Sequence, residues 1–480
     1  MLKGGMIKIL TEDDIEQIHL SALSILWRIG IEVREEQAFR ILQKAGCPTS
    51  GLRVRIPAHL VEDAIRLAPK TFTLYGRDPK FKVPLEDRRV FYEPMIGRLN
   101  ILDPENGKRR RTTLQDVSDL VRVADYLEHY TLLHSGAIMP HIEGIPDEVS
   151  HVHGYYASVK NSSKVIKGVV RGKQKARDCI RMAAIIAGGE ERLKHRPNIF
   201  TTCNVISPLQ FAPEQTEGLI EYARMGLPVD IASEPQCGAT SPATLSGTLA
   251  QQTAEILGMM VVAQLVNPGT PVLMGTVGAA MDMRNGTIAL GGVEAAMINV
   301  AHAQMARFYQ IPSRGTGSNT ESKSLDIQAG IEKTLTLMMP ALAGINMIFY
   351  PGTMDHALTV SLESLVIDHE ICGMIDRMLR GIAVDDASLG IDVMEKVGPG
   401  GHFLNQAHTL TNFQKEHYIP RLCDRDSHES WLAKGSPGML DEAKGTVRKI
   451  LSEHKPAPLD PAVEKELLAV IEEVEKREGL

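Results

Sequence analysis

The sequence predicts an α/β fold, namely a TIM (β/α)8 barrel with a helical and β-hairpin extension before it and another extension after it. From about residue 90 onward, short apolar strand candidates alternate with amphipathic helix candidates, which is the pattern of a parallel βα repeat. The strand candidates number about eight, as such a barrel requires. We expect the N-terminal extension to span residues 1–88, the barrel 89–394 and the C-terminal extension 395–480.

The N-terminal extension begins with a predicted helix over residues 11–47. Thr11 can cap it, and apolar residues such as Ile15, Ile18 and Ala22 recur at helical spacing. A second helix is expected over residues 57–67. A β-rich stretch follows, and Asn106-Gly107 within it is a hairpin turn signal.

The barrel elements are predicted from hydrophobic periodicity and from the glycine and proline residues between them. The predicted strands are 90–93, 131–139, 165–170, 199–205, 228–232, 271–276, 312–315 and 347–350, and the predicted helices are 114–127, 147–160, 173–188, 213–225, 246–266, 290–308 and 327–343. Gly226, Gly269 and Gly344 follow helices and precede strands, as glycines at helix C-caps do. In the tail, a glycine-rich segment at 397–401 precedes a charged helix over 461–478, for which Asp460 is the expected cap.

Composition excludes several classes of function. The net charge of −7 argues against nucleic-acid binding, and the basic run 108–111 is interpreted as a solvated hairpin edge. No apolar run of signal length opens the chain, and the apolar stretch 256–266 is too short to span a bilayer. The six cysteines form no closely spaced ligand pair, so we expect no zinc site and a reducing, cytoplasmic location.

Polar and aromatic side chains stand at the predicted strand ends, where barrel enzymes carry their chemistry. They are Tyr92, Glu93, His134, Met139, Lys167, Thr202, Asn204, Glu234, Gln236, Thr276, Arg314, Ser318, Phe349 and Tyr350, with His356 just beyond. Among them we find no serine-histidine-aspartate arrangement, no phosphate-binding glycine loop and no metal-ligand spacing. Such a site either binds without reacting or uses a reactive atom brought from outside. A lyase that forms an imine at Lys167 is a third reading.

Four long segments carry a resemblance to a known family: 320–333 (TESKSLDIQAGIEK), 361–371 (SLESLVIDHEI), 398–410 (GPGGHFLNQAHTL) and 424–435 (DRDSHESWLAKG). In this order they resemble the trimethylamine methyltransferase family, nearly from end to end of the chain. The resemblance implies a TIM barrel that transfers a methyl group from a methylated amine to the cobalt of a separate corrinoid protein. It implies no tightly bound cofactor.

Founding members of that family carry pyrrolysine, whereas this chain contains only standard amino acids. The sequence is therefore similar to members that act on quaternary amines. Glycine betaine is the first candidate substrate; proline betaine, carnitine, γ-butyrobetaine or binding without turnover are the alternatives. A quaternary nitrogen leaves as a neutral tertiary amine, so the leaving group needs no proton, and cobalt(I) supplies the attacking electrons.

The strand-end reading then gives each residue a role. We expect Tyr92, Phe349 and Tyr350 to face the ammonium, because aromatic rings attract such cations. Glu93 or Glu234 would supply the counter-charge.

The remaining candidates would hold a substrate carboxylate or a protein partner. Arg314, His356 and Asn204 are expected to bind the carboxylate, and Gln236 completes the substrate-binding set. Gly400, His402 and His408 are candidates for docking the corrinoid protein. No residue of the chain is expected to be the nucleophile, and a homo-oligomer is expected because barrels of this size often associate.

Overall fold

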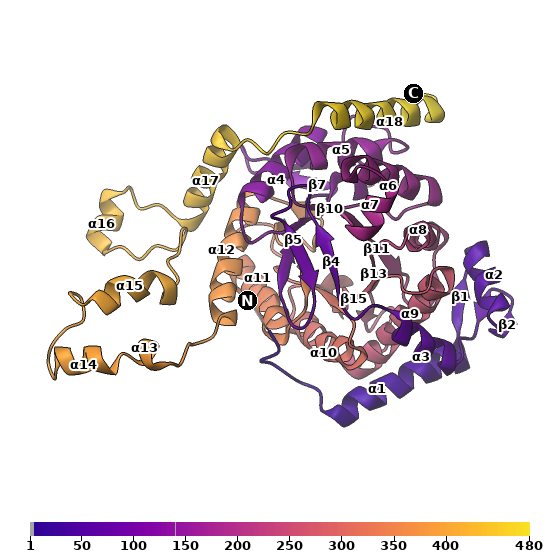
Figure 1. Ribbon diagram of the computed structural model, residues 1–480, viewed down its shortest axis with the longest axis horizontal. Helices are drawn as coiled ribbons and strands as arrows, with labels where there is room; N and C mark the ends of the chain where they lie inside the picture. Colours follow the sequence, from indigo (N-terminus) through magenta and orange to yellow (C-terminus); the bar gives the residue numbers. More distant parts are fainter. Residues whose placement is uncertain (1–3, 140) are drawn as a thin grey trace.

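The computed structural model describes residues 4–139 and 141–480, and its centre is a parallel barrel of eight strands (Figure 1). In chain order they are β6 (Phe91–Glu93), β9 (Leu132–Leu133), β10 (Val165–Lys167), β11 (Ile199–Val205), β13 (Val229–Ser233), β15 (Val272–Thr276), β18 (Ser313–Thr316) and β19 (Met347–Phe349). Each pairs with the next, and a bridge between Tyr92 and Tyr130 closes the barrel between β6 and β9. The predicted barrel is confirmed.

The helices between the strands form the outer wall. They are α4 (Leu114–Tyr126), α5 (Ser150–Asn161), α6 (Lys173–Ala187), α8 (Pro213–Arg224), α9 (Leu245–Val266), α10 (Val293–Tyr309), α11 (Ile327–Ala343) and α12 (Leu362–Leu379). Seven of these match the predicted helices with ends shifted by no more than three residues; α12 is additional. Local capping explains the boundaries: Thr113 and Asp116 form a capping box at α4, and Gly344 ends α11 at a φ of 86°.

Helix α9 is apolar around its whole circumference and is long and apolar enough to cross a membrane by composition alone. It packs against α1 (Glu12–Ser24), α3 (Ala58–Leu67), α8 and strand β13. In its most apolar stretch of 18 residues, 89% is buried inside the protein. Burial from all sides is the setting of a core helix.

The helical prediction for residues 11–47 is confirmed for 12–29 and 36–44 but is wrong between them, where the chain forms a strand. Helix α1 ends at Ser24 and a π-helical turn, η1 (Ile25–Ile29), continues to Gly30, whose φ of 81° stops it. Strand β1 (Ile31–Val33) then pairs with β12 (Gln210–Phe211) and β3 (Arg53–Val54), before helix α2 (Glu36–Lys44). The local helical period was overridden by pairing with a strand almost two hundred residues away. The second predicted helix is confirmed as α3.

A hairpin of β4 (Phe72–Tyr75) and β5 (Lys82–Leu85) covers the amino end of the barrel. Leu74, Val83 and Leu85 form a buried apolar cluster with residues from the barrel strands, among them Leu132 and Phe200. The hairpin therefore closes this end with apolar packing and leaves the carboxyl ends of the strands as the open mouth.

Two small sheets form the rim of that mouth from the loops after the strands. One contains β7 (Asn100–Leu102), β8 (Arg109–Arg111), β20 (Thr353–Met354) and β21 (Thr359–Val360); the other contains β14 (Gln236–Cys237), β16 (Ala279–Asp282) and β17 (Thr287–Ala289). The hairpin predicted around Asn106-Gly107 is β7–β8. Loops tied into sheets hold their side chains in fixed positions.

The last barrel helix, α12, ends at Leu379, ahead of the boundary expected at residue 394. Residues 381–437, which we call the projecting arm, contain α13 (Asp386–Leu389), α14 (Ile391–Val397), α15 (Ala407–Glu416) and α16 (His428–Ala433) and extend sideways from the barrel (left side of Figure 1). The chain returns in α17 (Met439–Glu453) against α12 and α4, and ends in α18 (Pro461–Glu478) against α5 and α6. Asp460 caps α18 as predicted.

Candidate active site

A cavity of about 370 Å³ lies at the carboxyl ends of the strands. Its lining residues are Met95, Arg98, His134, Ile138, Lys167, Gly168, Val170, Arg171, Thr201, Thr202, Asn204, Gln215, Glu234, Arg314, Phe349 and Tyr350. A larger hollow of about 710 Å³ lies beside the amino end, where Lys70, Arg88 and Arg307 are among the residues around it. The smaller cavity is the candidate active site, because the inward-facing charged residues of the barrel strands converge there.

Two buried ion pairs form the floor of this cavity. Lys167 Nζ lies 2.8 and 3.0 Å from the two carboxylate oxygens of Glu93, and Arg314 Nε lies 3.4 Å from Asp230 Oδ2. All four side chains are at most 2% exposed. Burial raises the pKa of Glu93 and lowers that of Lys167, and in each case the charge of the partner opposes the shift.

The aromatic side chains of the cavity are already in contact with cations of the protein. Phe349 has Lys167 Nζ and Arg314 Cζ each 4.4 Å from its ring centroid, and it stacks on Tyr350 at 4.3 Å. Arg98 Cζ lies 5.2 Å from the Tyr350 centroid. His134 stacks on Phe349 at 5.3 Å. Phe349 and Tyr350, two of the rings expected to face the ammonium, therefore contact cations of the protein itself.

Three residues that line the cavity carry a polar atom without a hydrogen-bond partner. Arg314 Nη1, Arg98 Nε and Asn204 Oδ1 are buried without a hydrogen bond. Buried donors and acceptors are normally satisfied, so a group aimed at a cavity without a partner is available to a ligand. Glu234 lies deep in the protein but keeps its side chain exposed to the hollow. The loss of water around the Glu234 carboxyl raises its pKa, while the positive charges of Arg314 and Arg98 oppose this shift.

The cavity thus offers both signs of charge to a small molecule. Arg98, Arg171 and Arg314 bring guanidinium groups, and Glu234 brings an accessible carboxylate. His134 stays neutral, because burial and nearby Lys167 lower its pKa well below its usual value. Its Nδ1 accepts a hydrogen bond from the Gly97 N–H at 3.2 Å.

Tyr350 is held in an unusual backbone conformation with a φ of 99°. Few residues other than glycine adopt this region, and the cost of doing so requires support from the surroundings. The support comes from the next turn, where the Gly352 N–H donates to Asp368 Oδ2 at 2.5 Å and the Thr353 N–H donates to the Tyr350 carbonyl at 3.1 Å. The tyrosine is therefore positioned by a carboxylate on α12.

Lys333 on α11 ties the same turn to the loop after β18. Its Nζ donates to Asp368 Oδ2 at 2.9 Å, to the Thr353 carbonyl at 2.6 Å and to the Ser318 carbonyl at 3.1 Å. Lys333 is 1% exposed and Asp368 is completely buried. Lys333 was not among the predicted site residues, although it ends the segment 320–333. A single lysine on an otherwise apolar helix face could have indicated a buried ion pair.

Six of the nine predicted substrate-binding residues lie at the cavity or in its floor: Glu93, Asn204, Glu234, Arg314, Phe349 and Tyr350. Tyr92 does not, because strand alternation turns it outward, where its hydroxyl donates to Asp376 Oδ1 at 2.9 Å. Gln236 lies in β14 on the rim and does not line the cavity.

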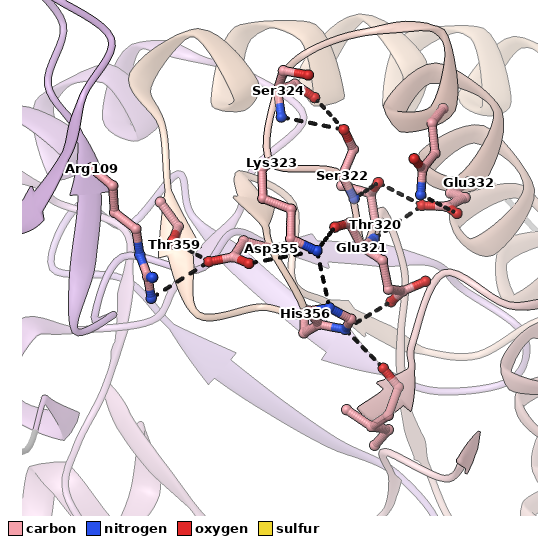
Figure 2. A network of polar contacts seen from close by, with 12 residues as sticks. Arg109, Thr320, Glu321, Ser322, Lys323, Ser324, Glu332, Asp355, His356 and Thr359 are labelled. Atoms are coloured by element: carbon pink, nitrogen blue, oxygen red, sulfur yellow. Dashed lines mark hydrogen bonds and ion pairs between the residues drawn. The ribbon is translucent and has the colours of Figure 1, made fainter. Parts of the chain in front are cut away.

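His356 belongs to a separate polar network on the rim (Figure 2). Its Nδ1 lies 2.9 Å from the Ile288 carbonyl and its Nε2 lies 3.2 Å from Lys323 Nζ. In the same network, Arg109 Nη2 lies 3.5 Å from Asp355 Oδ2. His356 therefore joins the loops after β15, β18 and β19, and the structure gives it no contact with the cavity.

The three docking candidates lie on the projecting arm. Gly400 and His402 are exposed, and His408 Nε2 lies 3.2 Å from the Ala387 carbonyl within the arm. Figure 1 shows the arm reaching away from the barrel of its own chain. Their role in docking stays a prediction.

One cluster in the described part of the chain has the residue types of a metal site: Glu128, His129 and His369, whose ligand atoms lie within 4.8 Å of one another. It lies outside the cavity lining. Arg421 Nη2 lies 2.5 Å from Glu128 Oε1, and His129 Nδ1 lies 2.7 Å from Asp376 Oδ2. The cluster is thus already occupied by internal ion pairs.

Arg98 and Arg171 were missed among the cavity residues. Arg98 lies in the loop after β6, and Arg171 lies just past the expected end of the third strand. No local pattern distinguishes these arginines from those on the surface. Only the closure of the barrel brings them beside Glu234.

Comparison with known proteins agrees with this architecture. A family model described as trimethylamine methyltransferase (MTTB) matches residues 3–479. The chain is 38% identical over 472 residues to the glycine betaine methyltransferase of Desulfitobacterium hafniense strain Y51, covering 98% of each. It is 34% identical over 474 residues to the trimethylamine methyltransferase MttB of D. hafniense strain DSM 10664 / DCB-2, covering 98% of this chain and 94% of that one.

A solved structure shares the fold. The monomethylamine methyltransferase MtmB of Methanosarcina barkeri superimposes with a TM-score of 0.52 at 14% identity, over 94% of this chain and 89% of that one. At this identity the likeness shows the architecture alone.

Proposed function

The chain belongs to the trimethylamine methyltransferase family and is a methyltransferase, and from that premise we propose that it removes a methyl group from a quaternary amine that also carries a carboxylate. The acceptor would be cobalt(I) of a separate corrinoid protein. Glycine betaine is the proposed substrate, because the relative at 38% identity bears that name.

The observation that carries the proposal is the pairing of opposite charges in one small cavity. Arg314 Nη1 has no partner, whereas Glu234 is an accessible carboxylate in the same lining. A betaine is a zwitterion with the complementary arrangement, and a bidentate contact with a guanidinium is among the strongest for a carboxylate. A methylamine without a carboxylate would leave the Arg314 donor unsatisfied, which carries a free-energy cost.

In this mechanism the chain binds and aims the substrate. Glu234 faces the ammonium, Arg314 and the Nδ2 amide of Asn204 donate to the carboxylate, and the cavity excludes water from the methyl group. The carbon–nitrogen bond breaks as the methyl group passes to cobalt(I), and the bonding pair stays on nitrogen. The tertiary amine leaves with a neutral nitrogen and without a proton, so the transfer requires no general acid.

A matched pair of substrates tests the proposal. Purified protein is mixed with reduced cobalamin and either glycine betaine or choline, which has the same ammonium with a hydroxyl in place of the carboxylate. We expect methylcobalamin to form with glycine betaine and about 100-fold more slowly with choline, as sites built around a buried polar group discriminate strongly. Binding of the betaine without any spectral change would instead indicate a binding protein without turnover.

The same assay ranks the alternative substrates. Carnitine and γ-butyrobetaine keep the trimethylammonium group and differ in the chain behind it, whereas proline betaine carries two methyl groups on a ring nitrogen. One methylene changes binding by about 1–3 kcal/mol. Rapid turnover of trimethylamine with none of any betaine would overturn the proposal. We further propose a cytoplasmic location, consistent with six cysteines that are all free, and a homo-oligomeric state.

A further inference from the structure

A second hollow adjoins the candidate active site. Its volume is about 640 Å³, and it shares Ile138 and Arg171 with the lining of the smaller cavity. We call it the outer hollow. It lies between the loops after β9 and β10 and the first turns of α5, α6 and α8. Because the two spaces have wall residues in common, a ligand of one lies next to a ligand of the other.

His151 on α5 is a buried polar side chain in the lining of the outer hollow. It is 1% exposed, and its Nε2 lies 2.9 Å from Asp178 Oδ2. Burial opposes ionisation of Asp178, but hydrogen bonds from His151 and Arg477 hold the pKa of this carboxyl far below its usual value. An ionised carboxylate can only accept hydrogen bonds, so the proton of the imidazole lies on Nε2.

The other ring nitrogen of His151 is an acceptor without a partner. Burial lowers the pKa of His151, although Asp178 opposes the shift, so the ring is neutral at neutral pH and its Nδ1 carries a lone pair. Nδ1 is buried and has no hydrogen bond with the described residues. Buried acceptors are normally satisfied. The outer hollow thus holds an unused acceptor for a ligand that carries an N–H or O–H group.

Two lysines of α6 bring positive charge to the same hollow. Lys173 and Lys175 both line it, and Lys175 Nζ donates to the Asp147 carbonyl, a neutral group, at 2.9 Å. Arg171 Nε, by contrast, lies 3.5 Å from Glu214 Oε2. Among the described residues no carboxylate lies within 4.0 Å of either lysine nitrogen. The hollow therefore combines an acceptor for N–H with cations that suit a carboxylate.

We propose that the outer hollow binds the demethylated product of the reaction, an amino acid with a protonated tertiary nitrogen. This inference rests on the proposed function. Methyl transfer leaves the bonding pair on nitrogen, and that pair then takes a proton from water. The product thus gains an N–H that the quaternary substrate lacks. This N–H donates to His151 Nδ1, and the product carboxylate meets Lys173 and Lys175.

The same acceptor disfavours the substrate. A quaternary ammonium has no N–H, so glycine betaine in the outer hollow would cover His151 Nδ1 without satisfying it, which costs about 1–3 kcal/mol. Sites built around a buried hydrogen-bonding group reject analogues that lack the matching group. The product can therefore pass from the inner cavity to a neighbouring site that the substrate does not fill.

Equilibrium dialysis with labelled N,N-dimethylglycine tests the proposal. Glycine betaine is added in saturating amount to fill the inner cavity, and cobalamin is left out. We expect one molecule of dimethylglycine to remain bound per chain. His151→Gln removes the acceptor but keeps an amide donor for Asp178, and it should weaken this binding about 10- to 100-fold. Lys173→Met changes only an exposed side chain and should weaken it about threefold.

The matched control is His153→Gln on the same helix. His153 Nε2 lies 3.0 Å from Glu475 Oε1, and the residue does not line the outer hollow, so dimethylglycine binding should stay unchanged. Circular dichroism verifies the fold of each variant. Displacement of all dimethylglycine by glycine betaine, or equal binding by the wild type and His151→Gln, would overturn the proposal. Methyl transfer without product binding would refute the outer hollow alone, whereas product binding without methyl transfer would refute only the proposed function.

Discussion

The floor of the cavity and the projecting arm break the usual distribution of polar and apolar residues in opposite ways. The floor encloses Glu93, Lys167, Asp230 and Arg314, all of which are charged side chains with at most 2% exposure. The arm leaves ten large apolar residues in water and buries none between 381 and 421. Buried charge is costly unless it is paired, and exposed apolar surface is unfavourable unless it is covered.

The two regions differ in whether the same chain compensates for the departure. In the floor the four charged side chains form two ion pairs, and Arg314, Arg98 and Asn204, which each carry a polar atom without a hydrogen-bond partner, line a cavity of about 370 Å³. On the arm, by contrast, the described residues of the same chain leave ten large apolar side chains exposed. The buried charge of the floor is therefore compensated within the chain, whereas the apolar surface of the arm is not.

The largest effect is expected where a buried charge loses its partner. Lys333→Met leaves Asp368 charged and enclosed, and breaking such a pair costs about 3–5 kcal/mol. Denaturation by urea should show this loss in the free energy of unfolding. Lys323→Met, at a side chain that is 66% exposed, is the control and should change it by less than about 0.5 kcal/mol. Equal losses in both variants would contradict the contrast between buried and exposed charge.

The second effect concerns the open guanidinium. Arg314→Lys keeps the positive charge beside Asp230 but removes the planar pair of donors. We expect kcat/KM for glycine betaine to fall about 10- to 100-fold, and that for choline to change little, because only the carboxylate contact is lost. A parallel fall for both compounds would mean that Arg314 supports the structure of the cavity and does not read the carboxylate.

The third effect is a shift in the pH dependence of the reaction. The pKa of Glu234 is raised by its surroundings, so this carboxyl keeps its proton to higher pH than an ordinary glutamate. The ionised form that attracts an ammonium exists above the raised pKa and is lost as the pH falls through it. We therefore expect kcat/KM to fall on the acid side at a pH above 4.5. Glu234→Gln should lower kcat/KM about tenfold at neutral pH and remove this acid limb.

The smallest effect is expected on the rim. Arg109 is 51% exposed in its contact with Asp355, and such surface pairs contribute about 0–1 kcal/mol. Arg109→Ala should leave the unfolding free energy and the kinetics with free cobalamin almost unchanged. A fall larger than tenfold in kcat or in kcat/KM would show that the network of Figure 2 positions the residues of the cavity.

Much of the fold could be predicted because each helix and strand shows its own hydrophobic periodicity in the sequence. Seven helices and the eight-strand count followed from local spacing and from glycines at helix ends, as at Gly344. The prediction failed where a distant strand intervened, at β1 after Gly30. Strand ends also indicated Glu93, Glu234 and Arg314, because the carboxyl ends of barrel strands converge.

What the sequence determined by itself is the order of the elements, their capping and the list of residues near the mouth. Those properties depend on neighbours a few positions apart. The tertiary structure decided that Glu93 pairs with Lys167, which lines the cavity, while Tyr92 turns away to Asp376, that Phe349 contacts two cations, and that the apolar side chains of the arm are exposed. Lys167 and Glu93 are 74 residues apart, and Lys333 and Asp368 are 35 apart. Pairings across such separations exist only once the barrel closes, so no local sequence pattern predicts them.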